Sequence, residues 1–270
     1  MQGSLGEKIG EGAFADVHAW APGQVVKLFK PGVPTAFGWH EAQMTHAAFA
    51  AGAAGPELFG TIFLEARFAM VLQRFDGPTL LQLTRSGAIT RTAAGATLAS
   101  LAFALHELPP PREVPSLYDA TAGALKFFTG KIVPEHIATG ILALVERLPP
   151  GGRLCHGDIH PDNVIVTAQG PRLIDWMGAV RAPAALDLAG THFGLTEIAP
   201  LYADEPERPR QVAAAALSEY ARLAGLSPAA LTEAMASCMP VAHLRALFGL
   251  AARTHREQLL QRIAAALDVK

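Results

Sequence analysis

The sequence predicts an α+β fold with two lobes, a small lobe built on a sheet and a larger, mainly helical lobe. Short strand-like segments separated by glycines dominate up to residue 76, and helical periodicity dominates from residue 77 onward. The strong turn signal Asp76-Gly77-Pro78 lies where the two patterns meet. We therefore expect residues 1–76 to form an N-terminal lobe and residues 77–270 to form a C-terminal lobe.

Five segments of the N-terminal lobe have strand character, at residues 5–9, 15–20, 24–29, 58–64 and 68–73. Glycine-containing turns join the first three segments, which predicts an antiparallel meander. Between the third and fourth segments the apolar spacing suits a helix over residues 36–51, which Gly52 and Gly55-Pro56 end. The lobe is therefore predicted to be a five-stranded antiparallel sheet with one helix.

The C-terminal lobe is predicted to consist mainly of helices. Leu98, Leu101 and Leu105 have the spacing of an amphipathic helix, which Pro109-Pro110-Pro111 ends. Similar patterns predict helices at residues 93–108, 116–128, 134–148, 184–197, 208–224 and from 227 almost to the C-terminus. A non-helical island interrupts them at residues 153–178, with strand-like segments at 164–167 and 171–174.

Composition excludes several classes of protein. Half of the residues are hydrophobic and 17% are charged, against roughly 25% in average domains, so the chain has ample material for a core. The 22 Lys and Arg residues against 24 Asp and Glu residues give a net charge of −2. This balance argues against a basic nucleic-acid-binding arm and against a polybasic membrane patch.

Cysteine content and apolar patterning bear on cellular location. Cys155 and Cys238 are too few for a disulfide framework or a multi-cysteine zinc site. The N-terminus lacks the basic and apolar regions of a signal peptide. The most apolar stretch, residues 234–252, contains Pro240 and Arg245, which favours buried helices over a bilayer span. We expect a cytoplasmic protein.

The island carries most of the chemistry, in the motif 156–163, which reads His-Gly-Asp-Ile-His-Pro-Asp-Asn. Asp158 is followed five positions later by Asn163, and Asp175 stands at the end of the next strand-like pair. Phosphoryl transfer from ATP requires this arrangement. Asp158 would accept or position the proton of an attacking hydroxyl, while Asn163 and Asp175 would supply hard oxygen ligands to magnesium.

Plainer interpretations exist for parts of this motif. A histidine, an aspartate and an asparagine around a proline also form ordinary capped turns. His156, next to the apolar Leu154-Cys155, is interpreted as a hydrogen-bonded scaffold residue. A zinc site on His156 and His160 is disfavoured, because Gly157 and Pro161 break the helix that would direct both rings at one ion.

A second group of residues precedes the island. Gly10 and Gly12 form a Gly-x-Gly pair before a strand, where backbone amides could approach phosphates, although a plain hairpin turn explains the pair equally well. Lys27 lies in a strand between apolar residues, and Glu41 lies on the following helix. Glu41 could hold Lys27 on the phosphates of a nucleotide, whereas each residue alone would be interpreted as a surface charge.

In this order the motifs resemble those of the aminoglycoside phosphotransferase and choline kinase superfamily, the small-molecule branch of the protein-kinase-like fold. The resemblance covers residues 5–188 in motif order. It implies a bilobal fold with Asp158 as catalytic base, Asn163 and Asp175 as magnesium ligands, and Lys27 with Glu41 at the phosphates. It also implies that the backbone of Gln73 to Phe75 binds adenine, with Leu72 behind it, and that Asp187 supports the lower lobe.

The sequence restricts the acceptor of the phosphate only in part. Between Asp175 and Asp187 there is no room for a long activation segment, so a small acceptor is favoured over a polypeptide. Residues 180–270 contain nine acidic and nine basic side chains, whereas a polycationic aminoglycoside would favour an acidic excess. Trp176 alone is a thin basis for the aromatic cage that choline requires.

We therefore expect a kinase that moves the γ-phosphate of ATP, with magnesium, to a hydroxyl group of a small molecule. GTP, which some members of the resembled family use, stays open as the donor. Two alternatives stay open as well, a catalytically silent nucleotide-binding module that regulates a partner and an atypical protein kinase.

Overall fold

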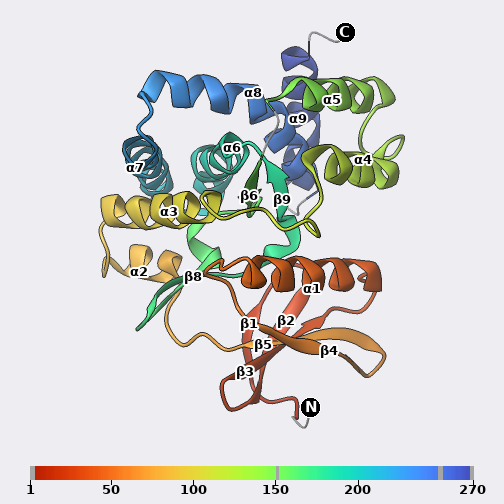
Figure 1. Ribbon diagram of the computed structural model, residues 1–270, viewed down its shortest axis with the longest axis vertical. Coiled ribbons are helices and arrows are strands. Elements are labelled where there is room, and N and C mark those ends of the chain that lie inside the picture. The colour runs from red at the N-terminus through yellow and green to blue at the C-terminus, as the bar shows by residue number, and fades with distance from the viewer. Residues whose placement is uncertain (1–3, 150–151, 249–251, 268–270) are drawn as a thin grey trace.

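The computed structural model describes residues 4–149, 152–248 and 252–267, and it has the two lobes that the sequence predicts (Figure 1). The N-terminal lobe, at the bottom of Figure 1, contains a five-stranded sheet in the order β1-β2-β3-β5-β4 with every neighbouring pair antiparallel. Its strands are β1 (Lys8–Glu11), β2 (Ala15–Ala21), β3 (Gln24–Phe29), β4 (Leu58–Leu64) and β5 (Arg67–Gln73). The predicted α+β class is confirmed.

Helix α1 (Thr35–Ala50) lies between this sheet and the C-terminal lobe (Figure 1). The helix approaches β5 closely at Gly38, where a β-carbon would come within 2.2 Å of the Phe68 ring. A residue larger than glycine would therefore push the helix away from the sheet. This close packing holds Glu41, one turn further along α1, over β3.

The C-terminal lobe is mainly helical and contains the largest apolar core of the molecule. Its helices are α2 (Leu80–Ser86), α3 (Arg91–His106), α4 (Leu117–Phe128), α5 (Glu135–Arg147), α6 (Ala185–Phe193), α7 (Glu207–Ala224), α8 (Pro228–Leu247) and α9 (Ala252–Ala266). Helix α6 lies in the middle of the lobe, with α3, α7 and α8 around it (Figure 1). No helix among the described residues is long and apolar enough to cross a membrane.

The non-helical island forms two small antiparallel sheets of two strands each. Strand β6 (Arg153–Cys155) pairs with β9 (Val180–Ala182), and β7 (Val164–Thr167) pairs with β8 (Gly170–Leu173). The motif 156–163 is the loop from β6 to β7, and the segment 174–179 is the loop from β8 to β9. The segment 174–179 packs against α1, where His40 Nε2 lies 3.2 Å from the Met177 carbonyl, and the turn 161–163 of the motif packs against α2.

Several elements differ from the sequence-based expectation. The first strand begins at Lys8, so Gly10 lies within it and Gly12 follows it. The seven-residue helix α2, which begins at a capping box of Thr79 and Gln82, was not predicted from the sequence. The long C-terminal helix is divided into α8 and α9, and the helix predicted to end at residue 197 continues after Phe193 as a π-helical turn. Strands β6 and β9 were not predicted, because three residues are too few for a periodic signal.

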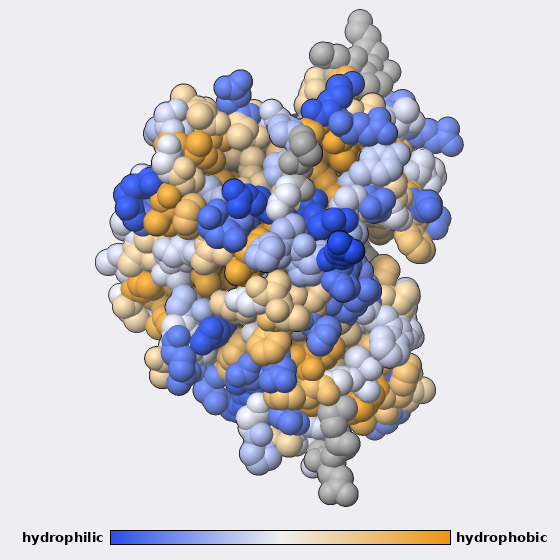
Figure 2. All heavy atoms as spheres, in the orientation of Figure 1, coloured by the Kyte–Doolittle hydropathy of each residue, from blue (hydrophilic) through white to orange (hydrophobic). Residues whose placement is uncertain are grey.

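Hydrophilic and hydrophobic residues are interspersed over the face of the molecule shown in Figure 2. Both cysteines are buried and free. The chain therefore relies on its apolar core, and not on cross-links, to hold the helical lobe together.

Candidate active site

Three charged side chains meet where the two lobes face each other. Lys27 of β3 places its Nζ 2.5 Å from Oε1 of Glu41 on α1 and 3.4 Å from Oδ1 of Asp175. The Glu41 side chain is buried, Lys27 is 14% exposed, and the Asp175 side chain is 45% exposed. The structure thus brings together a lysine, a glutamate and an aspartate that are up to 148 residues apart in the sequence (175 − 27 = 148).

At Glu41, burial changes the pKa more than the attraction of the neighbouring cation does. Desolvation raises the pKa of Glu41 to about 6, although the ammonium of Lys27 opposes this rise. Desolvation lowers the pKa of Lys27, but Glu41 and Asp175 outweigh it, so the net shift is upward. Lys27 is therefore a permanent cation, and its Glu41 partner titrates near the lower end of the neutral range.

The predicted catalytic base, Asp158, lies on the loop between β6 and β7 with a side chain that is 63% exposed. The Asn163 Nδ2 group donates to the Asp158 backbone carbonyl at 3.0 Å and to its Oδ2 at 3.3 Å. His160 Nε2 lies 3.5 Å from the same Oδ2. Desolvation raises the pKa of Asp158, but His160 outweighs it and holds this pKa below its ordinary value. Asp158 is consequently an accessible carboxylate at neutral pH.

The two predicted magnesium ligands are adjacent. The Ile174 N–H donates to the Asn163 carbonyl at 3.0 Å, which places Asp175, the next residue, beside Asn163. Asp175 has a left-handed backbone with φ of +66° and ψ of +70°. A non-glycine residue in this conformation is typical of functional sites. A carboxylate and an amide oxygen are the donors that magnesium prefers, so the residues present fit this ion.

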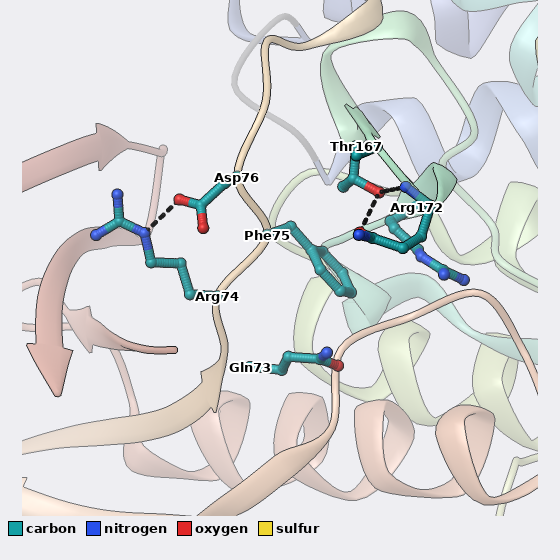
Figure 3. Close-up of a pocket in the computed structure, with 8 residues that line it drawn as sticks. Gln73, Arg74, Phe75, Asp76, Thr167 and Arg172 are labelled. Carbon is teal, nitrogen blue, oxygen red and sulfur yellow. Dashed lines mark hydrogen bonds and ion pairs between the residues drawn. The ribbon is translucent and has the colours of Figure 1, made fainter. Parts of the chain in front are cut away.

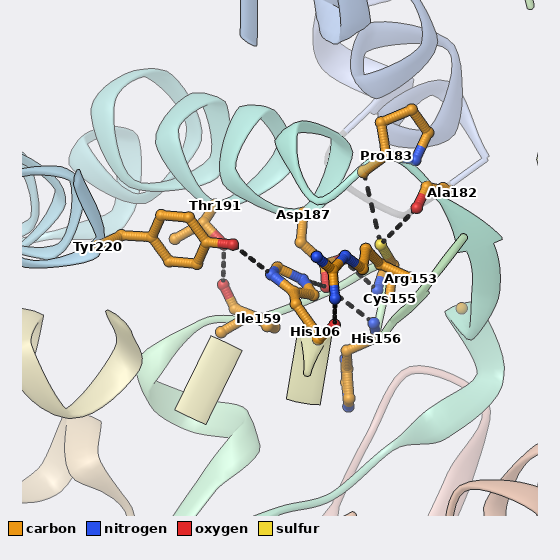
Figure 4. A network of polar contacts seen from close by, with 12 residues as sticks. His106, Arg153, Cys155, His156, Ile159, Ala182, Pro183, Asp187, Thr191 and Tyr220 are labelled. Carbon is orange, nitrogen blue, oxygen red and sulfur yellow. Dashed lines mark hydrogen bonds and ion pairs between the residues drawn. The ribbon is translucent and has the colours of Figure 1, made fainter. Parts of the chain in front are cut away.

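Asp187 of α6 fixes the start of the catalytic loop (Figure 4). Its Oδ2 accepts the His156 N–H at 2.8 Å and its Oδ1 accepts the Gly157 N–H at 2.6 Å. His106 Nε2 lies 3.1 Å from Oδ2, and His106 Nδ1 lies 2.8 Å from the Tyr220 hydroxyl. Because a carboxylate can only accept, Nε2 carries the proton and Nδ1 accepts from Tyr220. Asp187 thus has the structural role that the resemblance implied.

A buried thiol completes the surroundings of Asp187. Cys155, His106 and Asp187 have ligand atoms within 4.8 Å of one another, a spacing that a metal site could also show. The Cys155 thiol, however, donates to the carbonyls of Ala182 and Pro183, and burial raises its pKa well above the ordinary value. The three side chains are therefore engaged in hydrogen bonds within the core.

His156 is a scaffold residue, as the sequence analysis interpreted it. The ring is buried, its Nε2 lies 3.1 Å from the Ile174 carbonyl, and it packs on Trp176 with ring centroids 4.6 Å apart. Burial lowers the pKa of His156, so the ring is neutral and donates to Ile174. The contact ties the catalytic loop to the segment that carries Asp175.

Arg245 of α8 is a site residue that the sequence analysis missed. Its guanidinium donates to the Gly178 carbonyl at 2.7 Å and fills the space beside Gly157, where a β-carbon would lie 2.2 Å from Nη2. Gly157 also has a φ of +82°, so a larger residue there would be strained as well as crowded. Burial lowers the pKa of Arg245, while Asp187 and Asp158 oppose this, and the guanidinium stays charged. A cation from a distant helix thus joins the two loops of the site.

A cavity of about 340 Å³ lies where the connection between the lobes meets the β7–β8 hairpin (Figure 3). The predicted adenine-binding residues Gln73 and Phe75 line it, and the Phe75 ring points toward the hairpin, whereas Arg74 turns away and pairs with Asp76. The full set of lining residues is Gln73, Arg74, Phe75, Asp76, Thr167, Ala168, Gln169 and Arg172. The hairpin wall was not predicted from the sequence.

Three other predicted nucleotide-binding residues lie outside this cavity. Leu72 is buried and pairs with Val25 across the sheet. Gly10 lies in β1 opposite Val17, and the Gly12 N–H donates to the Ala15 carbonyl at 2.8 Å, as in a tight hairpin turn. Their assignment to the nucleotide therefore stays a prediction.

Two glutamates of the acidic segment 204–207 in the C-terminal lobe are ion-paired with arginines. Glu205 lies 2.7 Å from Arg91 and 2.5 Å from Arg208, and Glu207 pairs with Arg210. Both glutamates are thus paired within the chain. These pairs neutralise charges that a polycationic acceptor would need.

Comparison with solved structures shows the same fold in aminoglycoside phosphotransferases. An aminoglycoside-3'-phosphotransferase of type VIII matches with a TM-score of 0.54 and 22% identity, over 88% of this chain and 93% of that chain. The 3''-Id aminoglycoside phosphotransferase from Streptomyces rimosus matches with a TM-score of 0.52 and 20% identity, over 86% and 92%. An ADP-bound aminoglycoside phosphotransferase of the 2''-Ib type matches with a TM-score of 0.54 and 15% identity, over 97% and 92%.

Comparison with curated proteins finds no significant sequence match. The sequence model described as the phosphotransferase enzyme family, however, matches residues 15–226. This range begins with β2, includes the Lys27, Glu41 and Asp175 group and the catalytic loop, and ends after α7. The chain belongs to the phosphotransferase enzyme family.

Proposed function

We propose that this phosphotransferase transfers the γ-phosphate of ATP, with magnesium, to a hydroxyl group of a small molecule. The observation that carries the proposal is a chain of contacts between the lobes. Lys27 lies 3.4 Å from Asp175, the residue before Asp175 donates to Asn163, and Asn163 donates to Asp158. Lys27 is held there as a cation, Asp158 is an accessible carboxylate, and Asn163 and Asp175 offer oxygen atoms. Each step of phosphoryl transfer requires one of these groups.

The roles follow from the charges. Lys27 would contact the phosphates of the nucleotide, with Glu41 holding its ammonium in place. Asn163 and Asp175 would hold magnesium, which neutralises charge on the phosphates when it is bound. Asp158 would accept the proton of the acceptor hydroxyl as this hydroxyl attacks. Most of the rate enhancement would come from position and charge, because the chain forms no covalent intermediate in this scheme.

The cavity at Gln73 and Phe75 supports binding of the base of the nucleotide. Residues 73–76 of the lobe connection border it on one side and the β7–β8 hairpin borders it on the other. The purine of the nucleotide would lie between these two walls, and GTP is an alternative donor to ATP. Structures of related fold were solved with ADP and with GDP, which supports testing both.

The acceptor is proposed to be a small molecule with a free hydroxyl group. The segment from Trp176 to Ala184 contains only a 3₁₀ turn and the three-residue β9 before α6 begins, so it offers little surface for an extended polypeptide. Two structures of related fold contain streptomycin and kanamycin. Aminoglycosides are therefore one class to test, beside uncharged and anionic hydroxyl compounds. The buried free thiols of Cys155 and Cys238 support action in the reducing cytoplasm.

The test is magnesium-dependent phosphate transfer from ATP to a panel of aminoglycosides, choline, amino-acid alcohols, nucleosides and sugars. Asp158→Asn should lower transfer to the accepted compound roughly a hundredfold or more, because the base is lost. Asp162→Asn is the matched control, since this acid lies on the same loop, and it should change transfer by no more than a few-fold. Equal transfer by wild type and Asp158→Asn would reject Asp158 as the base.

A further inference from the structure

The two carboxylate oxygens of Asp158 have different surroundings. Asn163 Nδ2 donates to Oδ2 at 3.3 Å, and His160 Nε2 lies 3.5 Å from the same oxygen. The described residues form no hydrogen bond with Oδ1. The loop therefore holds one oxygen of the base and leaves the other directed to the surroundings.

The protonation of the His160 ring follows from its second contact. His160 is the N-cap of the 3₁₀ turn Pro161–Asn163, where its Nδ1 lies 3.3 Å from the Asp162 N–H. A nitrogen that accepts a hydrogen bond carries no proton, so the proton of the neutral ring lies on Nε2. Nε2 is thus a donor, and the group that it faces is Asp158 Oδ2.

We infer that His160 is a positioning residue that holds Asp158 through Oδ2, so that Oδ1 is the oxygen that receives the proton of the acceptor hydroxyl. The inference rests on the proposed role of Asp158 as base. In the step, the acceptor oxygen forms a bond to the γ-phosphorus while its proton passes to Oδ1. The bond from the γ-phosphorus to the bridging oxygen breaks, and the nucleoside diphosphate leaves with that electron pair.

Capping alone does not require a histidine at this position. Serine, threonine, aspartate and asparagine cap a helical turn with one short polar side chain. A histidine is different because its two nitrogens lie on opposite sides of a rigid ring, so one caps the turn while the other reaches back to Asp158. The two functions can therefore be separated by substitution.

His160 also offers a cleaner test than its neighbour. Asn163 contacts the same oxygen, but it is a proposed magnesium ligand, so its loss would change metal binding and base orientation together. His160 has no part in the proposed metal site. A change at His160 should affect the rate of transfer and leave nucleotide binding unaffected.

The first experiment compares His160→Ser, which keeps a capping oxygen without the reach, with His160→Gln, which keeps a donor at similar reach. Magnesium-dependent ATP hydrolysis, with water as acceptor, gives kcat and KM, and urea denaturation gives stability. We expect His160→Ser to lower kcat about tenfold or more, with KM for ATP and the denaturation midpoint nearly unchanged. His160→Gln should recover kcat to within a few-fold of wild type, and the exposed His136→Ser on α5 should equal wild type.

The kinetic outcomes decide the role of His160. Wild-type kcat in His160→Ser would overturn the inference, because the cap alone would then be sufficient. Equal loss of kcat in the serine and glutamine variants would also overturn it, because a donor at similar reach would then not restore kcat. A parallel fall in denaturation midpoint and kcat for serine would also overturn it, because His160 would then act through folding.

A second measurement does not depend on activity. Nitrogen-15 NMR of the His160 ring at about pH 8.5, where an imidazole is neutral, reports which nitrogen carries the proton. We expect Nε2 to be protonated and its resonance to shift in Asp158→Asn, with assignment from the signal lost in His160→Gln. If Nε2 carried no proton in an active protein, the inference about His160 would be overturned and the proposed function would stand. A wild-type protein that neither hydrolyses ATP nor transfers phosphate would instead overturn the proposed function, and the role of Oδ1 with it.

Discussion

Glu41 in the N-terminal lobe and Asp187 in the C-terminal lobe are both carboxylates with 2% of their surface exposed, yet their surroundings are opposite. Glu41 contacts Lys27 through Oε1, and its Oε2 has no hydrogen-bond partner among the described residues. Asp187 accepts two backbone N–H groups and the His106 ring. One acid has a single partner and the other has three.

The pKa shifts follow this difference in partners. Burial raises the pKa of Glu41 to about 6, because one ammonium does not compensate for the loss of water. Burial also raises the pKa of Asp187, but His106 and the backbone amides outweigh it, so the net shift is downward. The comparison shows that hydrogen-bond donors, rather than exposure, determine whether a buried acid stays charged.

The difference in partners corresponds to a difference in role, structural for Asp187 and ligand-related for Glu41. Every partner of Asp187 belongs to the C-terminal lobe, so this network is complete without a ligand. The partner of Glu41 is Lys27, which also contacts Asp175 of the C-terminal lobe, and we propose that nucleotide and magnesium bind there. We therefore expect substitutions at Asp187 to act on folding and substitutions around Glu41 to act on nucleotide use.

The largest effect is expected from Asp187→Asn. The side-chain amide of asparagine would place an N–H group against N–H donors that now contact a carboxylate oxygen. At least one buried donor would then lose its acceptor. The free energy of unfolding should fall by about 3 kcal/mol or more, as measured by urea denaturation. The exposed Glu233→Gln on α8 is the control and should unfold like wild type. A small change in the Asp187 variant would mean that the network does not hold the loop.

Lys27→Met, in contrast to Asp187→Asn, should affect kinetics more than stability. Loss of the cation at the phosphates should lower kcat/KM for ATP roughly a hundredfold, while the free energy of unfolding changes little, because Glu41 can take up a proton when its partner is lost. Steady-state kinetics and urea denaturation measure the two quantities. Lys30→Met, directly after the same strand, is the matched control. A large loss of stability with unchanged kinetics would remove the contrast between the two acids.

The pH dependence of nucleotide use should be centred on Glu41. As the pH falls through about 6, Glu41 takes up a proton and holds Lys27 less firmly, so KM for ATP should rise several-fold. In Glu41→Gln this rise in KM near pH 6 should be absent. The comparison thereby separates protonation of Glu41 from protonation of ATP itself. Identical pH profiles in the two proteins would contradict the assignment.

The raised pKa of Glu41 also predicts how the stability of the fold depends on pH. The pKa of Glu41 is about 6 in the folded chain against an ordinary value of 4.5. A raised pKa stabilises the fold below pH 4.5, and this contribution is lost as the pH rises through about 6. Urea midpoints of wild type should therefore decline relative to Glu41→Gln over that range, whereas midpoints that run parallel would place the pKa of Glu41 at its ordinary value.

The parts of the site that could be predicted from the sequence are those whose residues follow one another in a fixed order. Asp158 and Asn163 share one loop, so their spacing alone indicates their chemistry. Lys27 and Glu41 were paired because a strand lysine is followed by a helix glutamate, and the observed ion pair confirms this pairing. The five strands with one helix were also predicted correctly, because each strand has its own turn signals.

The missed parts depend on contacts between distant segments. Arg245 stands in an apolar stretch, where it was interpreted only as an obstacle to a membrane span, although a charged residue in an apolar helix also indicates a buried partner. The Thr167–Arg172 wall of the cavity carries no motif. His106 and Tyr220 are 114 residues apart, and neither has local sequence features that point to the other.

The smallest effect should come from Tyr220→Phe, which tests the outer end of the Asp187 network. The substitution removes the hydroxyl that donates to His106 Nδ1 and leaves the ring in place against Phe103 and His106. A buried nitrogen without a donor should cost about 1 kcal/mol in free energy of unfolding, as measured by urea denaturation, with kcat nearly unchanged. Because His106 would keep its proton on Nε2, Asp187 would keep all three donors. A fall in kcat comparable to that of Asp187→Asn would show instead that Tyr220 determines the orientation of His106, and that the network acts as one unit from α7 to the catalytic loop.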